Sequence, residues 1–246
     1  MLKPLLVAVQ FMTRLPVPRA WLPEAYDDKL MGQSALAYPV VGLIIGLILW
    51  GVASLISSLP SLLVAALLLM VWVFITGALH LDGLADCADA WVGGQGDPER
   101  TLAIMKDSFI GPVGVAVLVS VLLVKFAALA SSSHLALAMI LTPVMSRAFV
   151  ILLFLTTPYV RENGLGQQQS RYLPRTPAYV MLLILTCGYL MLLGSSGVMP
   201  LIFVGAVFAL LRWQFIRRVG GMTGDIAGAV LEIMEAVFLV VFVWVL

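Results

Sequence analysis

Long apolar stretches alternate with short polar segments along almost the whole chain. A helix needs about 20 apolar residues to cross the roughly 30 Å hydrocarbon core of a membrane, and lipid offers the backbone no other hydrogen-bond partner. The stretches of this kind lie at residues 35–57, 61–80, 110–130, 135–157, 177–196, 198–216 and 227–246. The pattern predicts an all-α, polytopic membrane bundle of about seven transmembrane helices, folded as one membrane-embedded domain over residues 1–246.

Charged residues between these stretches fall on alternate loops. Lys and Arg occur in the N-terminal segment and in every second loop, whereas the loops at 57–61, 131–134 and 194–200 hold no Lys, Arg, Asp or Glu. Because basic residues accumulate on the cytoplasmic side of a membrane, we expect the N-terminus in the cytoplasm. All of the 13 acidic residues except Glu232 and Glu235 lie in the same segments, so the chemistry is expected on the cytoplasmic face.

Composition narrows the class of protein further. Hydrophobic residues make up 62% of the chain and charged residues 11%, against roughly 25% charged residues in soluble domains. This excludes an ordinary soluble enzyme. The formal net charge of +1 leaves no basic excess for phosphate backbones. We therefore expect the lipid bilayer as a partner and no nucleic acid.

The most informative motif is acidic and follows the second apolar stretch. Asp82, Asp86 and Asp89 are spaced i, i+4 and i+7, which places them on one stripe of a helix. No basic residue between them relieves their repulsion, and Mg²⁺ binds to carboxylates together with substrate phosphates. The motif predicts a magnesium and diphosphate site at the end of the second transmembrane helix. The alternative is a solvated helix end. His80 fits a base, a phosphate contact or an interfacial histidine.

A second polar segment follows at residues 97–107. Asp97 as N-cap and Pro98 at the first position predict a short helix. Arg100 and Lys106 are candidate phosphate contacts and Asp107 a candidate metal ligand. A solvated surface helix explains the same residues equally well.

The last apolar stretch carries Asp225, Glu232 and Glu235 on one face. An acid at the centre of a membrane helix costs about 2.5–3.5 kcal/mol on insertion scales and usually faces the interior of the bundle. Lys125 and Arg147 are the only basic residues deep in the predicted helices, so we favour structural ion pairs with the two glutamates. Asp225 lies near the surface, where it can join the metal site. A transporter that uses the buried charges as an ion or proton path is the competing class.

Residues 80–89 resemble the signature of the cobalamin synthase, or adenosylcobinamide-GDP ribazoletransferase, family. The resemblance runs nearly end to end. Further segments similar to the motifs of that family are 11–18, 39–42, 105–108 with Gly111, 146–147, 161–166 and 221–225.

The resemblance implies a Mg²⁺-dependent, multi-pass enzyme of the bacterial cell inner membrane. Such an enzyme transfers the cobinamide-phosphate moiety of adenosylcobinamide-GDP to α-ribazole or α-ribazole 5′-phosphate and releases GMP. Asp82 or His80 would act as the catalytic base. The implied metal ligands are Asp82, Asp86, Asp89, Asp107 and Asp225. The implied substrate contacts are Arg14, Arg100, Lys106, Thr223 and Arg147.

Other membrane transferases remain alternatives by mechanism. The Ala-Arg pair of the CDP-alcohol phosphotransferase signature is absent after Asp82-Gly83, because Ala85 is followed by Asp86. An intramembrane prenyltransferase calls for a second acidic repeat, which Asp107 or Asp225 alone does not supply. The sequence leaves the oligomeric state open, a homo-oligomer included.

Overall fold

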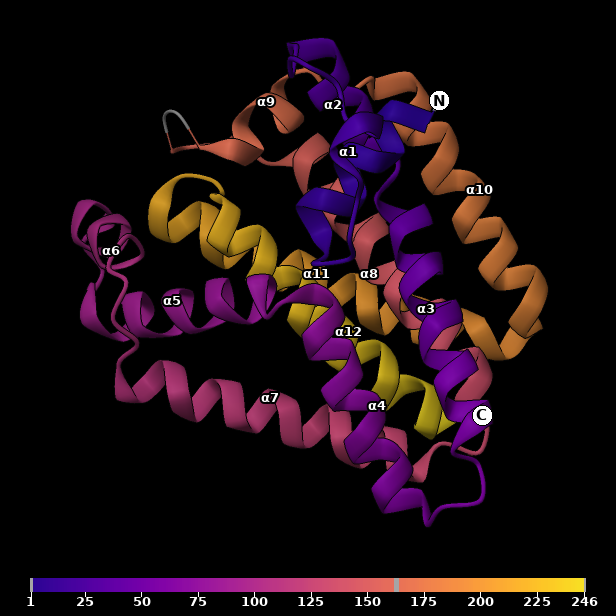
Figure 1. Cartoon of the computed structure of the whole chain (residues 1–246). Helices are drawn as coiled ribbons and strands as arrows, with labels where there is room; N and C mark the ends of the chain where they lie inside the picture. The colour runs from indigo at the N-terminus through magenta and orange to yellow at the C-terminus, as the bar shows by residue number, and fades with distance from the viewer. Residues whose placement is uncertain (1, 162–163, 246) are drawn as a thin grey trace.

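The computed structural model describes residues 2–161 and 164–245, and every regular element in these ranges is helical (Figure 1). The all-α prediction is confirmed. The helices are α1 (Leu2–Met12), α2 (Asp28–Leu36), α3 (Tyr38–Leu55), α4 (Ser61–Thr76), α5 (Leu79–Gly93), α6 (Pro98–Ile104), α7 (Pro112–Ser131), α8 (Leu135–Thr156), α9 (Leu165–Arg171), α10 (Arg175–Leu193), α11 (Val198–Val219) and α12 (Gly224–Val245), with 3₁₀ turns η1 (Arg19–Trp21) and η2 (Gly194–Gly197).

The number of membrane spans is lower than the predicted seven. Within the described chain, five helical segments are long and apolar enough to cross a membrane, or six if the bent pair α4 and α5 forms one span. The runs at 177–196 and 198–216 fall within one helical stretch, Arg175–Val219, in which η2 separates α10 from α11. The helix α4 has only 16 residues, fewer than a span requires. The protein is a polytopic membrane bundle, and the side of its N-terminus stays a prediction.

A sharp corner separates α4 from α5. The two helix axes meet at 89°, because Gly77 (φ 61°) and Ala78 (φ 55°) both adopt the left-handed conformation. Such a residue ends a helix, and glycine does so without a steric penalty. This corner, which was not predicted, separates the acidic motif from the apolar helix that precedes it. The motif occupies a separate helix that turns away from α4.

The helices α8 and α12 form the centre of the bundle and are its most buried long helices. The helix α3 packs along α8, and α12 packs against α5, α7 and α8. Small residues permit the closest of these approaches, as is common between membrane helices. A Cβ atom on Gly42 of α3 would clash with the carbonyl group of Pro143 in α8.

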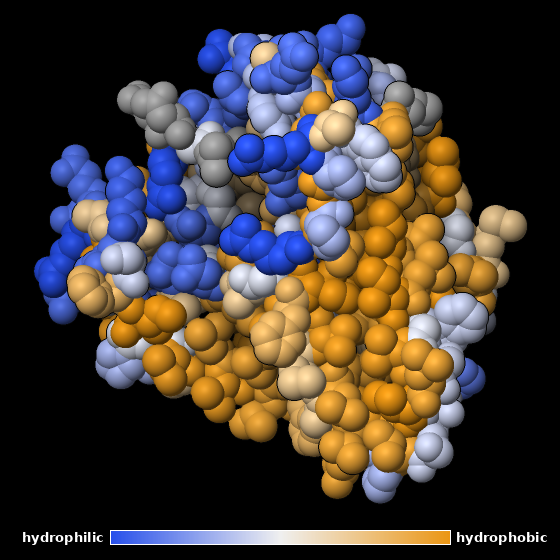
Figure 2. Space-filling view, viewed as in Figure 1, coloured by the Kyte–Doolittle hydropathy of each residue, from blue (hydrophilic) through white to orange (hydrophobic). Residues whose placement is uncertain are grey.

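The surface divides into a polar and an apolar region. Figure 2 shows hydrophilic residues gathered over α1, α2, α9 and α6, and hydrophobic residues covering α3, α4 and α7. Exposed leucine, valine and phenylalanine side chains on these last three helices, such as Leu47, Phe74 and Leu123, form the apolar region. The acidic helix α5 runs between the two regions (Figure 1).

Candidate functional site

The acidic helix α5 lies directly against the beginning of α12. A Cβ atom on Gly83 would stand 2.7 Å from the carbonyl oxygen of Asp225, and one on Gly228 would stand 3.2 Å from the carbonyl oxygen of His80. Each helix therefore supplies a glycine where the other backbone passes. This approach brings Asp82 and Asp86 on α5 close to Asp225 on α12, and Asp86 interacts electrostatically with both.

Arg161 is the cation of this cluster, and it is not among the site residues predicted from the sequence. Its guanidinium lies 2.7 Å from the carboxylate of Asp225 and donates a 3.5 Å hydrogen bond to the carbonyl oxygen of Met105. Among the described residues, its Nε has no hydrogen-bond partner. One sequence feature could have pointed to Arg161: it begins segment 161–166, which is one of the segments that carry the family resemblance. Glu162 and Asn163 of that segment lie outside the described residues.

Two connections between helices hold Arg161 beside Asp225. Tyr159 and Met222 form an isolated parallel bridge, in which Val160 N–H donates to the carbonyl of Met222 and Met222 N–H donates to that of Pro158, each at 2.9 Å. Burial raises the pKa of Tyr159 above its ordinary value. Its phenol therefore stays protonated at neutral pH next to the acidic cluster.

Thr223 supports the same cluster from inside the protein. It is fully buried. Its hydroxyl donates to the carboxylate of Asp225 at 3.4 Å and accepts from Ile226 N–H at 3.3 Å. The hydroxyl of Thr223 thus caps the first turn of α12 and contacts Asp225, and a contact between Thr223 and substrate stays a prediction.

Asp89 anchors α5 to α7. Its carboxylate accepts hydrogen bonds from Gly111 N–H at 2.7 Å and Gly114 N–H at 2.9 Å, at the positively polarised beginning of α7. A Cβ atom on Gly114 would clash with the same carboxylate. This capping role was not foreseen, and the metal-binding role of Asp89 stays a prediction.

The polar residues around α6 lie on the surface apart from the acidic cluster. Asp97 caps this helix as predicted, because its carboxylate accepts from Glu99 N–H at 2.9 Å and Arg100 N–H at 3.2 Å. Arg100 and Lys106 are exposed. Asp107 accepts from Phe109 N–H at 3.1 Å. In the described chain, none of the last three forms an ion pair or hydrogen bond with the cluster.

Arg218 ties α6 and α5 to α11. It donates to the carbonyl of Trp91 and to the hydroxyl of Thr101, and its guanidinium stacks 5.0 Å from the centre of the Trp91 ring. The position of α6 against α5 is thus fixed by α11.

Arg14 lies at the corner where the acidic helix begins. Its N–H donates to the carbonyl of Ile75 at 2.7 Å, and its exposed side chain runs over Gly77 so closely that a Cβ atom there would clash with it. A guanidinium at this position is available to a phosphate group.

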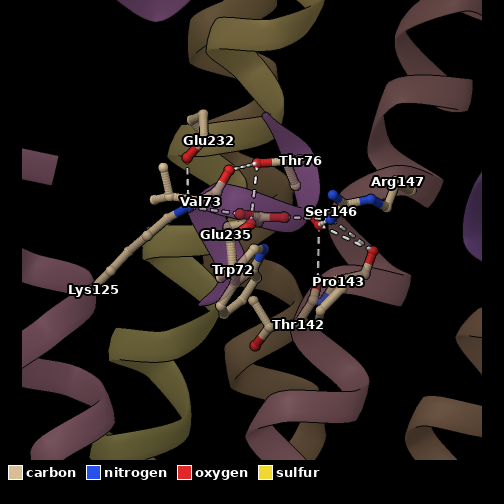
Figure 3. A network of polar contacts seen from close by, with 10 residues as sticks. All are labelled: Trp72, Val73, Thr76, Lys125, Thr142, Pro143, Ser146, Arg147, Glu232 and Glu235. Carbon is tan, nitrogen blue, oxygen red and sulfur yellow. Dashed lines mark hydrogen bonds and ion pairs between the residues drawn. The ribbon is translucent and has the colours of Figure 1, made fainter. Parts of the chain in front are cut away.

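The buried charges form one network, which confirms the predicted structural ion pairs (Figure 3). Lys125 Nζ of α7 lies 2.5 Å from the carboxylate of Glu232 and 2.6 Å from that of Glu235, both on α12. Arg147 of α8 pairs with the other oxygen of Glu235. Arg147 has no exposed surface, and a contact between Arg147 and substrate stays a prediction.

His80 belongs to the buried side of α5. It is 9% exposed, interacts electrostatically with Arg147, Glu235 and Lys125, and has no described partner for its Nδ1. The role of His80 as catalytic base stays a prediction, as does magnesium binding. Within residues 2–161 and 164–245, no group of three or more His, Cys, Asp or Glu side chains is arranged to hold a metal ion.

Comparisons with known proteins match this chain to one family over nearly its full length. The family model described as cobalamin-5-phosphate synthase matches residues 4–243. Proteins named adenosylcobinamide-GDP ribazoletransferase are similar to this chain. The one from Stutzerimonas stutzeri (strain A1501) is 51% identical over 96% of both chains. The one from Pseudomonas aeruginosa (strain PAO1) is 50% identical over 97% of both chains. No solved structure matches significantly. The chain therefore belongs to the cobalamin-5-phosphate synthase family.

Proposed function

We propose that this chain catalyses the adenosylcobinamide-GDP ribazoletransferase reaction. It would transfer the cobinamide-phosphate moiety to α-ribazole or α-ribazole 5′-phosphate and release GMP. Relatives about 50% identical over almost the whole chain carry this name. The observation that carries the proposal is the approach of α5 and α12, which gathers Asp82, Asp225 and Arg161 around Asp86.

The donor set of this cluster suits Mg²⁺. Three carboxylates face one described cation, Arg161, so negative charge is in excess. Carboxylate oxygens are ligands that Mg²⁺ prefers, and it usually binds one or two of them together with substrate phosphates. The three described carboxylates of Asp82, Asp86 and Asp225 are not arranged as a three-ligand site, so one or two of them would hold the ion together with the diphosphate. Asp89 would position α5 through its cap on α7, and Asp107 lies on the surface beyond α6.

The protein takes little covalent part in this reaction, so catalysis depends mainly on positioning of the substrates and electrostatic stabilisation. A hydroxyl oxygen of ribazole forms a bond to the phosphorus attached to cobinamide, and the bond from that phosphorus to the oxygen of GMP breaks. In α-ribazole 5′-phosphate the 5′ oxygen is already esterified, so another ribose hydroxyl must attack. A bound Mg²⁺ would offset charge on the diphosphate oxygens.

The residues of the chain would then have distinct tasks. Asp82 is exposed on α5 and can accept the proton of the attacking hydroxyl, whereas His80 is buried. Arg14, at the α4–α5 corner, and Arg161 would contact diphosphate oxygens. The uniform placement of basic segments supports an active site on the cytoplasmic face of the bacterial inner membrane.

A transporter is less well supported. The four buried charges that would form an ion path compensate each other within one network of Lys125, Arg147, Glu232 and Glu235. Each side chain is at most 4% exposed, so no member of the network reaches a surface.

Release of GMP tests the proposal. Membranes that contain the protein are incubated with Mg²⁺, adenosylcobinamide-GDP and α-ribazole 5′-phosphate. We expect GMP release, its loss with Asp82→Asn, and full activity with Glu24→Gln, which removes an exposed carboxylate from the loop before α2. Absence of GMP release by correctly inserted native protein contradicts the function. Full activity of Asp82→Asn contradicts the site.

A further inference from the structure

A polar pocket of about 530 Å³ adjoins the acidic cluster. It lies between the end of α8, the following loop and the helices α9 and α10. Its polar wall consists of Thr156, Tyr159, Gln167, Ser170, Arg171 and Arg175. The volume falls within the roughly 300–1,000 Å³ of typical small-molecule sites.

Two arginines give the pocket its charge. Arg171 ends α9 and Arg175 begins α10, and both guanidinium groups are exposed at the same opening. Neither forms an ion pair with an acidic side chain in residues 2–161 or 164–245, although Arg171 lies 5.6 Å from the centre of the Tyr172 ring. Paired guanidinium groups with a nearby hydroxyl suit a phosphate group, which they bind through parallel charge-assisted hydrogen bonds.

Part of the lining of the pocket is apolar. Phe154 and Leu155 contribute to it from the last turn of α8. A small anion alone would make no favourable contact with these apolar side chains. A ligand that carries an aromatic ring at one end and a phosphate at the other would satisfy both parts of the lining.

Tyr159 connects this pocket to the acidic cluster. It lines the pocket and pairs with Met222 in the bridge that holds Arg161 beside Asp225. Tyr159 therefore belongs to the pocket lining and also interacts electrostatically with Arg161 and Asp225.

We propose that this pocket binds the phosphoryl acceptor, with Arg171 and Arg175 on the 5′-phosphate and the apolar part of the lining against the benzimidazole ring. This inference rests on the proposed function and adds a preference: the pocket would favour the phosphorylated acceptor. The free ribose hydroxyls would then face Tyr159 and the cluster.

The test compares two acceptors that differ only in the phosphate. The KM for α-ribazole 5′-phosphate and for α-ribazole is measured with the native protein, with Arg171→Gln and Arg175→Gln, and with the double variant. We expect each single substitution to raise the KM for the phosphorylated acceptor roughly tenfold, as expected for loss of a charge-assisted hydrogen bond, and to leave the KM for α-ribazole unchanged. The matched control is Arg217→Gln, since Arg217 is an exposed arginine of α11 that stacks on Trp213.

The outcomes separate three explanations. Unchanged KM values for both acceptors, or an equal rise for both, overturn the inference while GMP release still supports the function. Equilibrium binding of radiolabelled α-ribazole 5′-phosphate to the detergent-solubilised protein checks the pocket without turnover, and undiminished binding by the double variant also overturns it. A lipid phosphate is the other source of the same chemistry. The substitutions could instead alter only the dependence of GMP release on the phosphatidylglycerol content of phosphatidylcholine vesicles. In that case the arginines bind lipid headgroups and the inference is wrong.

Discussion

The carboxylate of Asp225 lies 2.7 Å from a guanidinium nitrogen of Arg161. Asp225 opens α12, and Arg161 follows α8 in a connection that reaches the same point through the bridge between Tyr159 and Met222. Both side chains are about one-fifth exposed. The pair is therefore accessible to a ligand while it is held by two helices.

The first prediction concerns Arg161. Surface ion pairs contribute only about 0–1 kcal/mol to stability, and this pair is partly accessible to solvent, so Arg161→Ala should lower the melting temperature only modestly. It should lower kcat/KM for GMP release by 10- to 100-fold, since it removes the one described cation of the cluster. Arg161→Lys should recover only part of this loss because lysine lacks the planar fork. Native kcat/KM in Arg161→Ala would show that the arginine merely positions a loop.

The second prediction concerns the contact between α5 and α12. Gly83→Ala places a Cβ atom 2.7 Å from the backbone carbonyl oxygen of Asp225, which forces the helices apart. Overpacking of this kind typically costs 1–3 kcal/mol, and it should also reduce GMP release by separating Asp86 from Asp225. The matched control is Gly205→Ala on α11, where no atom lies within 4 Å of the added Cβ. That variant should be as stable as the native protein or more so. Equal thermal shifts for both variants would refute the packing argument.

The sequence could predict those features of the site that depend on residues close together in the chain. It could not predict those that depend on contacts between distant segments. The stripe of Asp82 and Asp86 follows from helical periodicity, which is local. The ion network of Lys125 with Glu232 and Glu235 could be predicted because uncompensated charges inside a membrane are too costly. The ion pair of Arg161 with Asp225 could not be predicted, since it depends on the bridge between Tyr159 and Met222, which lie far apart in the sequence.

The corner at Gly77 and Ala78 was missed for a related reason. The apolar stretch 61–80 contains no proline and no charged residue, so its composition suits one continuous helix. The left-handed conformation of Ala78 is unfavourable for a residue with a Cβ atom and requires support from tertiary packing. The side chain of Arg14, which packs over Gly77, belongs to another part of the chain. The capping role of Asp89 was not predicted either, because its partners are the backbone N–H groups of Gly111 and Gly114, which leave no side-chain pattern in the sequence.

The third prediction separates capping from metal binding within the acidic stripe. Asp89→Ala removes the acceptor of two backbone N–H groups at the beginning of α7, and loss of such a cap costs about 0.5–2 kcal/mol. We expect a lower melting temperature with an unchanged Mg²⁺ concentration for half-maximal GMP release. Asp86→Asn should do the reverse, raising that concentration without lowering the melting temperature. A rise in the Mg²⁺ requirement of Asp89→Ala as large as that of Asp86→Asn would identify Asp89 as a ligand.

The last prediction concerns Glu235, the centre of the buried network. Its two oxygens pair with Lys125 of α7 and Arg147 of α8, so Glu235→Ala leaves two buried cations with one carboxylate between them. Breaking a buried pair in this way costs about 3–5 kcal/mol, which predicts a large fall in melting temperature and in the amount of folded protein. The folded fraction should keep the native KM for adenosylcobinamide-GDP, because the side chains of the network are at most 4% exposed. The double variant Glu232→Gln with Lys125→Met, which removes one charge of each sign, should be less damaging than Lys125→Met alone. A change in KM without a loss of stability would mean that these charges act on the substrate, as a transport path or a catalytic group would.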